Sequence, residues 1–200
     1  MNPAVATRAA FLRPWLIWTA GFLAFPIAGL AGTTVAGRVD SPPAALTAGL
    51  IVGAVIGTAQ SLTAGGRLHH RRWITATTIG MGLGLLLGAV AVDYGTALAD
   101  LAVLGAITGL VLGVGQALAL PTRARARWAW AAALPALWAL GWTVTTLIGY
   151  EVDKQVPVFG ASGAAGFAAL SGALLHALLP TDRATRTRER LPHARMESPA

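Results

Sequence analysis

The composition of the chain excludes a soluble globular domain. Of its 200 residues, 55% are hydrophobic and 12% are charged, whereas soluble domains carry about 25% charged residues. The net charge is +7 and there is no cysteine, which excludes disulfides, thiol catalysis and thiolate metal sites. We therefore expect an integral membrane protein built as one bundle of helices.

Six apolar segments follow one another along the chain. Each is long enough to cross a hydrocarbon core of about 30 Å as a helix, and none alternates as a β-barrel strand does. The segments are 15–32, 44–64, 73–92, 101–120, 128–150 and 160–179. The predicted fold class is all-α: a polytopic integral membrane protein with six transmembrane helices arranged as three out-and-back hairpins.

The basic residues predict how these spans are oriented. All but two of the 15 lysines and arginines lie before the first span, in the second and fourth connections, or after the last span; the exceptions are Arg38 and Lys154. Because positive residues in short loops stay cytoplasmic, we expect both termini inside the cell. The division of charge among short loops argues against nucleic-acid binding and favours anionic lipid headgroups as partners.

The expected organisation is a cytoplasmic segment at 1–13, a six-helix bundle at 14–180, and a basic cytoplasmic tail at 181–200 that we expect to be disordered. An alternative is that the first apolar run is a signal peptide cleaved near Ala31. We prefer retention because this run completes a repeat. The wealth of alanine, glycine and arginine is typical of a GC-rich bacterial genome, so the expected location is the bacterial plasma (inner) membrane.

Two segments of the chain have nearly the same sequence. GLIVGAVIGTAQSL begins at Gly49 and GAITGLVLGVGQAL begins at Gly105, and a basic cluster and a tryptophan follow each. The sixth span offers a weaker third copy. We therefore predict a repeated hairpin unit at about 14–72, 73–127 and 128–180.

Glycine at every fourth position predicts close helix packing. Lipid tails are as apolar as the helices, so spans associate through tight contacts between small residues. The predicted helix-packing residues are Gly49, Gly53, Gly57, Gly80, Gly84, Gly88, Gly105, Gly109 and Gly113. We expect the returning spans to form an inner cluster around a pseudo-threefold axis along the membrane normal. We expect the tryptophans, which all lie on outgoing spans, to anchor at headgroup level.

Three polar residues near the cytoplasmic ends of the returning spans form the candidate ligand-binding or pore-lining set. They are Gln60, Gln116 and His176, one in each predicted hairpin. At equal depth they would line a vestibule for a polar ligand. The alternative is that they cap helix-end carbonyls or meet interfacial water.

Other residues are weaker candidates. Asp93 and Asp100 flank an outer connection where paired carboxylates bind cations or relay protons, although such residues more often mark the ends of spans. Trp138 and Trp142 lie one turn apart and either stack on a ligand or fill the core. No charged residue lies in the middle of a span, which argues against a proton-coupled pump or an ion exchanger.

The sequence GASGAAG around Ser162 resembles the serine-bearing helix of rhomboid intramembrane proteases, which also have six spans. The resemblance implies a serine nucleophile with a histidine base on a later span. Here Ser162 lies on the last span. His176 follows on the same helix about 21 Å away by helical rise, beyond the reach that a nucleophile and its base need.

The spacing of Ala20, Ala24 and Ala28 resembles the alanine face of the substrate-binding subunits of energy-coupling-factor vitamin importers. Those subunits also have six spans and use that face against a transmembrane partner. The resemblance implies a partner subunit at the first span.

The leading functional expectation is small-molecule transport or a ligand-binding membrane component. The alternative is a structural or accessory subunit that packs against a larger membrane complex through glycine and alanine faces. An intramembrane enzyme is the least supported reading, and the motifs for metal, nucleotide or cofactor sites are absent. We therefore expect no enzymatic activity, no cofactor and no metal. The expected partners are the bilayer, its anionic headgroups, and a membrane-protein partner or a second copy of the chain.

Overall fold

The computed structural model describes residues 3–149 and 154–179, and within these ranges every regular element is helical. Six helical stretches are long and apolar enough to cross a membrane: Phe11–Ala36, Pro42–Thr63, His70–Ala91, Leu98–Ala119, Arg127–Leu147 and Ala161–Leu178. The prediction of an all-helical, multi-pass membrane protein is confirmed. The predicted tail at 181–200 lies outside the described residues.

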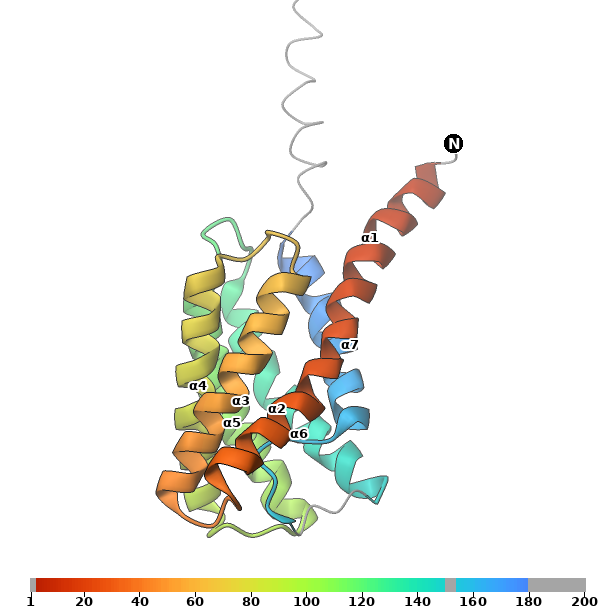
Figure 1. Ribbon diagram of the computed structural model, residues 1–200. Coiled ribbons are helices and arrows are strands. Elements are labelled where there is room, and N and C mark those ends of the chain that lie inside the picture. The colour runs from red at the N-terminus through yellow and green to blue at the C-terminus, as the bar shows by residue number, and fades with distance from the viewer. Residues whose placement is uncertain (1–2, 150–153, 180–200) are drawn as a thin grey trace, which may run out of the picture.

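The first span is one path made of three helical pieces. α1 (Pro3–Ala20) passes into a 3₁₀ turn, η1 (Gly21–Leu23), and then into α2 (Ala24–Ala36). Pro26 explains the interruption, because a proline lacks an N–H donor and its ring displaces the carbonyl four residues earlier, that of Phe22. The break bends the span, so that it lies diagonally across the bundle (Figure 1).

The remaining spans are single helices. They are α3 (Pro42–Thr63), α4 (His70–Ala91), α5 (Leu98–Ala119), α6 (Arg127–Leu147) and α7 (Ala161–Leu178). α3 begins with two prolines, which suit the first turn because its N–H groups have no intrahelical acceptor. The first span ends at Gly37, whose φ of 74° is open to glycine without strain.

The spans form a closed ring in chain order. Each helix from α2 to α7 packs against the next one, and α7 packs against α1. The connections at 64–69 and 120–126 lie at the same end of the bundle as the start of α1 and the end of α7, and the other connections lie at the opposite end (Figure 1). Arg67, Arg123 and Arg125 are therefore at one end, and Arg38 and Lys154 are at the other.

The glycine stripes lie at the seams between neighbouring helices. A Cβ atom built on any of the nine predicted packing glycines would lie 3.0 Å or less from an atom of the next helix. The stripe of α3 faces α4, that of α4 faces α5, and that of α5 faces α6. The expected inner cluster of returning spans is therefore wrong: the returning helices α3, α5 and α7 alternate with outgoing helices around the ring. The reason is that each glycine stripe brings its helix close to the backbone of the next helix in the chain.

Tryptophan fills the space inside the ring. The side chains of Trp18, Trp73, Trp130, Trp138 and Trp142 are at most 2% exposed, so the expectation that tryptophans sit as a group at headgroup level is wrong. Trp128 is the most exposed of the tryptophans, at 54%. The indole rings supply the bulk that the glycine-rich helices lack.

The seams predict where the bundle tolerates a methyl group. At Gly53 an added Cβ would lie 2.6 Å from the carbonyl oxygen of Thr77, whereas at Gly166 it would meet nothing within 4 Å. We expect Gly53→Ala to lower the unfolding free energy by about 1–3 kcal/mol, as overpacking typically does, and Gly166→Ala to leave it nearly unchanged. Unfolding of both variants in detergent, followed by circular dichroism, measures this; equal stability of the two variants would contradict the seam.

Candidate functional site

The two predicted glutamines lie inside the ring and accept hydrogen bonds from tryptophan. Trp73 of α4 donates its indole N–H to Oε1 of Gln60 on α3 over 3.1 Å. Trp130 of α6 donates to Oε1 of Gln116 on α5 over 2.9 Å. Gln60 is 6% exposed and Gln116 is 1% exposed. Each glutamine thus accepts a hydrogen bond from a tryptophan near the start of the following hairpin.

The amide nitrogen of Gln116 joins these two pairs. It donates to Oγ1 of Thr77 over 2.9 Å and, over a longer 3.4 Å, to Oε1 of Gln60. The Thr77 side chain is fully buried. The structure therefore brings Gln60 and Gln116 together, and both Oε1 atoms and the amide nitrogen of Gln116 are bonded to protein. A buried amide without partners would destabilise the fold, so this bonding matters for stability.

The third seam, between α1 and α7, has the same form with a different acceptor. Trp18 donates its indole N–H to Oγ of Ser171 over 3.1 Å, and Ser171 donates to the carbonyl oxygen of Ala168 over 3.3 Å. The three indoles also touch each other: the ring centroids of Trp73 and Trp130 are 5.8 Å apart, and each is 6.4 Å from Trp18. They form the tryptophan triad, Trp18, Trp73 and Trp130, at the centre of the ring.

His176 is not part of this group. Its ring meets Phe11 edge-on with centroids 4.7 Å apart, and its buried Nδ1 has no hydrogen-bond partner. In the third hairpin, Ser171 occupies the position that the sequence analysis assigned to His176. A signal for it was present, because Gly160, Ala164 and Ala168 precede Ser171 by 11, 7 and 3 residues, the spacing that Gly49, Gly53 and Gly57 have from Gln60.

Trp138 and Trp142 belong to a second aromatic cluster, nearer the other end. The ring of Trp138 is 4.9 Å from Phe159, 5.7 Å from Phe167 and 6.5 Å from Phe25, and that of Trp142 is 6.0 Å from Phe159. These contacts fill the core, and both indole rings are 1% exposed. Their indole nitrogens have no partner among the described residues.

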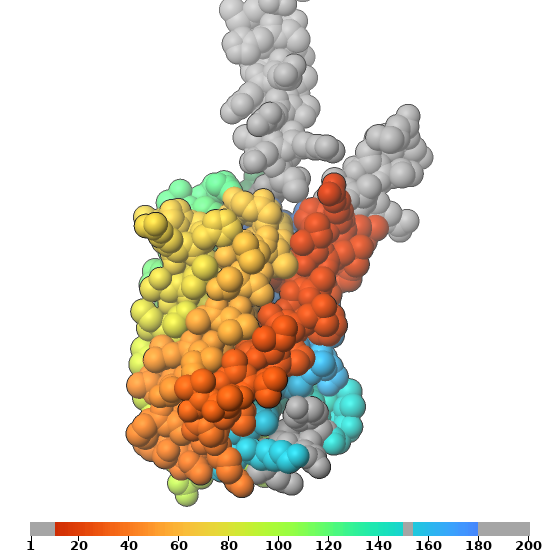
Figure 2. Space-filling model, viewed as in Figure 1, coloured from red at the N-terminus to blue at the C-terminus, as the bar shows by residue number. Residues whose placement is uncertain are grey.

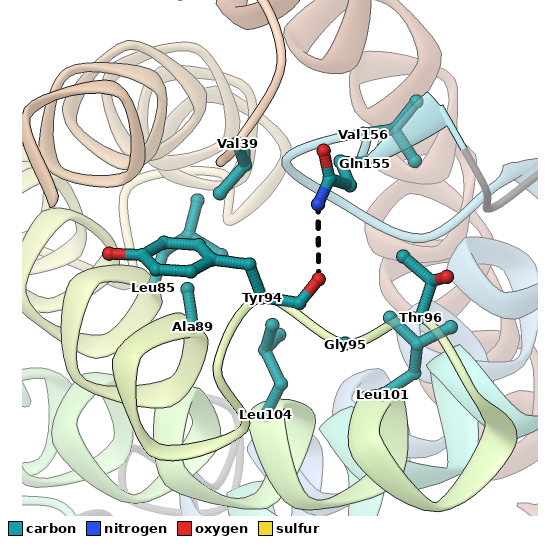
Figure 3. A pocket seen from close by; sticks show the side chains of 10 residues that line it. All are labelled: Val39, Leu85, Ala89, Tyr94, Gly95, Thr96, Leu101, Leu104, Gln155 and Val156. Atoms are coloured by element: carbon teal, nitrogen blue, oxygen red, sulfur yellow. Dashed lines mark hydrogen bonds between the residues drawn. The ribbon is translucent and has the colours of Figure 1, made fainter. Parts of the chain in front are cut away.

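Gln155 ties the three outer turns together (Figure 3). Its Nε2 donates to the carbonyl oxygen of Tyr94 over 3.1 Å, its Oε1 accepts from Arg38 over 3.0 and 3.1 Å, and its own carbonyl accepts the N–H of Val39 over 3.1 Å. Asp93, Tyr94 and Gln155 have φ between 48° and 58°, a region uncommon for side-chain-bearing residues. The bonds around Gln155 hold the backbone there.

The space left beside Tyr94 is small. The cavity that Figure 3 draws has a volume of about 20 Å³, room for no more than a single water. The Tyr94 hydroxyl is buried without a partner among the described residues. The cavity beside Tyr94 is therefore too small for an organic ligand.

The remaining candidates lie apart from both clusters. Asp93 is exposed, Asp100 lies in the first turn of α5, and the described residues contain no group of three or more potential metal ligands. Ser162 lies in the first turn of α7 and His176 in its last turn, so the helix separates them. Ala24 and Ala28 are buried in the bundle and Ala20 is exposed, so two of the three alanines of this face make internal contacts.

The end that carries most loop arginines holds a half-buried arginine. Arg67 donates from Nε to the carbonyl oxygen of Ala64 over 2.9 Å, and Arg123 donates to the carbonyl oxygen of Arg67 over 3.2 Å. Burial lowers the pKa of Arg67 from its ordinary value, yet a guanidinium stays charged at any physiological pH. These bonds join the two connections of this end.

Comparison of the chain with protein-family models, with curated proteins and with solved structures found no match. The function therefore has to be argued from the geometry alone. Within the described residues, that geometry is a packed core, and one hydroxyl faces an imidazole: Oγ of the buried Ser61 lies 2.9 Å from Nδ1 of the exposed His70.

The bonded core predicts a coupling between Gln116 and Trp130. Gln116→Leu removes the acceptor of the Trp130 indole and leaves that donor buried, which destabilises by about 1–3 kcal/mol. Trp130→Phe in the same chain removes the orphaned donor, so the double variant loses less than the sum of the single variants. Unfolding of the four proteins in detergent measures the coupling, and strict additivity would contradict the hydrogen bond.

Proposed function

We propose that this chain is a structural or accessory subunit of a larger membrane assembly, and not a carrier that works through its own axis. The observation that supports this most is the tryptophan triad, whose rings occupy the centre of the ring of helices at centroid distances of 5.8–6.4 Å. A carrier of this size needs a polar cavity near the bilayer midplane. Here the three indole N–H groups of the triad are bonded to Ser171, Gln60 and Gln116.

The tightness of the seams also supports a rigid unit. Alternating access requires one group of helices to move against another. In this ring, a Cβ built on the stripe glycines of α3, α4 and α5 would lie 3.0 Å or less from the following helix, and the bonds of Gln155 tie the outer turns. Such packing favours a scaffold over a moving carrier.

A surface suited to a partner helix lies on α7. Gly166, Ala173 and Ala177 are exposed along one side of this helix together with Leu170, which is 48% exposed, and nothing lies within 4 Å of a Cβ built on Gly166. By contrast, the outward side of α4 carries bulky Ile79 and Leu83, which are 50% and 43% exposed and suit contact with lipid. Small residues allow a neighbouring backbone to come close, so we assign the α7 side to the partner, which is another membrane protein or a second copy.

The finer features of the fold belong to the same proposal. We infer that the three hairpins are internal repeats, because the three seams between them each carry a tryptophan bonded to a polar side chain of the preceding helix. We also infer that both termini are cytoplasmic and that the membrane is the bacterial plasma membrane, from the arginine distribution and the composition.

Cysteine labelling tests the closed axis and the orientation together, because the chain has no native cysteine. We expect Arg125→Cys to react with a membrane-impermeant maleimide from the cytoplasmic side and Lys154→Cys from the outer side. Ser171→Cys, at a fully buried position, should react from neither side until the protein is unfolded. Rapid labelling of Ser171→Cys from one side would indicate a water-filled axis and favour transport.

The partner surface has a separate test. A photo-crosslinking amino acid at Gly166 should give one adduct of defined mass in native membranes, and the same group at Leu83 should give none, because Leu83 faces lipid. An adduct at twice the mass of the chain identifies a homo-oligomer, and a different mass identifies a partner protein. Crosslinking that is equal at both positions, or absent at both, would overturn the assignment of α7.

A further inference from the structure

A groove opens between the first turns of α4 and the last turns of α5. Its volume is about 460 Å³, and its lining includes Arg71, Arg72, Ala76, Gly115 and Leu118. The part of the groove that Arg71 and Arg72 line is thus strongly basic, and the part that Ala76 and Gly115 line is apolar and narrow. The narrow part exists because Gly115 has no side chain, and a Cβ there would lie 3.4 Å from the carbonyl oxygen of Ala76.

The two arginines have no counter-charge among the residues that the structure describes. Both are exposed, and neither has an ion pair or a side-chain hydrogen bond with a described residue. The acidic residues that the structure describes, Asp40, Asp93 and Asp100, belong to the turns at the opposite end of the bundle. Two arginines that are consecutive in the sequence and line an apolar groove are complementary to an anion that carries an apolar chain.

The groove continues into the lipid-facing surface. Leu118, in the last turn of α5 and so at the arginine end of the groove, is 61% exposed, and Ile79 and Val114, further from that end, are 50% and 38% exposed. These side chains lie on transmembrane helices, so the apolar part of the groove faces acyl chains. A soluble phosphate would use the arginines and leave this part unoccupied.

We propose that this groove, which we call the α4–α5 groove, binds one anionic phospholipid. Its phosphate lies between Arg71 and Arg72, and an acyl chain lies along Ala76, Gly115 and Leu118. Arginine is well suited to this role, because its planar donors match phosphate oxygens in pairs. This inference is independent of the proposed accessory role, because a closed scaffold and a carrier could both hold such a lipid.

Native mass spectrometry of the detergent-purified protein tests the site. The probes are phosphatidylglycerol and phosphatidylcholine with the same acyl chains, each titrated separately. We expect the first phosphatidylglycerol to bind more tightly than phosphatidylcholine, and R71Q/R72Q to weaken it about tenfold or more, since each basic residue near an anionic headgroup contributes substantially. Equal affinity for the two lipids would overturn the proposal.

Two further variants separate a defined site from general attraction. R125Q/R127Q removes the same charge from the same end, and Arg127 precedes Trp128 as Arg72 precedes Trp73, but neither residue lines the groove. It should keep the tight lipid. Gly115→Leu keeps both arginines and fills the groove, and it should also weaken binding. A loss in R125Q/R127Q as large as in R71Q/R72Q would show diffuse electrostatics and overturn the site.

A competition experiment decides between a lipid and a soluble anion. Inorganic phosphate at millimolar concentration should not displace the bound phosphatidylglycerol, because it makes no contact with the apolar groove. Displacement by phosphate, or full affinity in Gly115→Leu, would indicate an anion site without an acyl chain and would overturn the lipid assignment. The melting temperature of each variant in detergent checks that it is folded.

Discussion

The structure depends on one constraint: helices in a bilayer gain little from hydrophobicity when they meet, so they must be held by close packing and by hydrogen bonds. This chain uses both at each junction between hairpins. Glycine stripes bring α3 to α4 and α5 to α6 until backbone atoms touch, and a tryptophan N–H bonds to a polar side chain across the same seam. The seam between α7 and α1 combines Gly172 and Ser171 with Trp18 in the same way.

The indole side chain suits this arrangement because it fills space and carries a single donor. A ring of glycine-rich helices would leave a hollow centre, and three indoles fill it. Each indole N–H would be costly to bury without an acceptor in a medium that has no water. The glutamine and serine acceptors are therefore explained by stability, and intramembrane polar residues that often mark a transport path here belong to the packing of the core.

The sequence predicted the elements well and their mutual arrangement poorly. The spans, their order and the packing glycines could be found because hydropathy and spacing depend on local sequence. The sequence did not predict which helices pack together. A glycine stripe marks the face at which another helix approaches closely, but it does not identify that helix. The tryptophans were misjudged for a related reason, since an interfacial anchor and a core-filling ring have the same composition, and only the partner of the N–H distinguishes them.

The candidate site shows the same limit residue by residue. Gln60 and Gln116 were found because two copies of one sequence aligned, and the structure brings their side chains to within 3.4 Å. His176 was predicted because His176 and Leu178 match the Gln-x-Leu positions of the other two copies, whereas the stripe of Gly160, Ala164 and Ala168 leads to Ser171. A third hairpin can replace an amide by a hydroxyl because an indole N–H needs any oxygen acceptor within reach, not a particular residue type. In such a bundle the small-residue spacing constrains the geometry more strongly than the identity of the polar group, so the stripe is the better guide to the equivalent position.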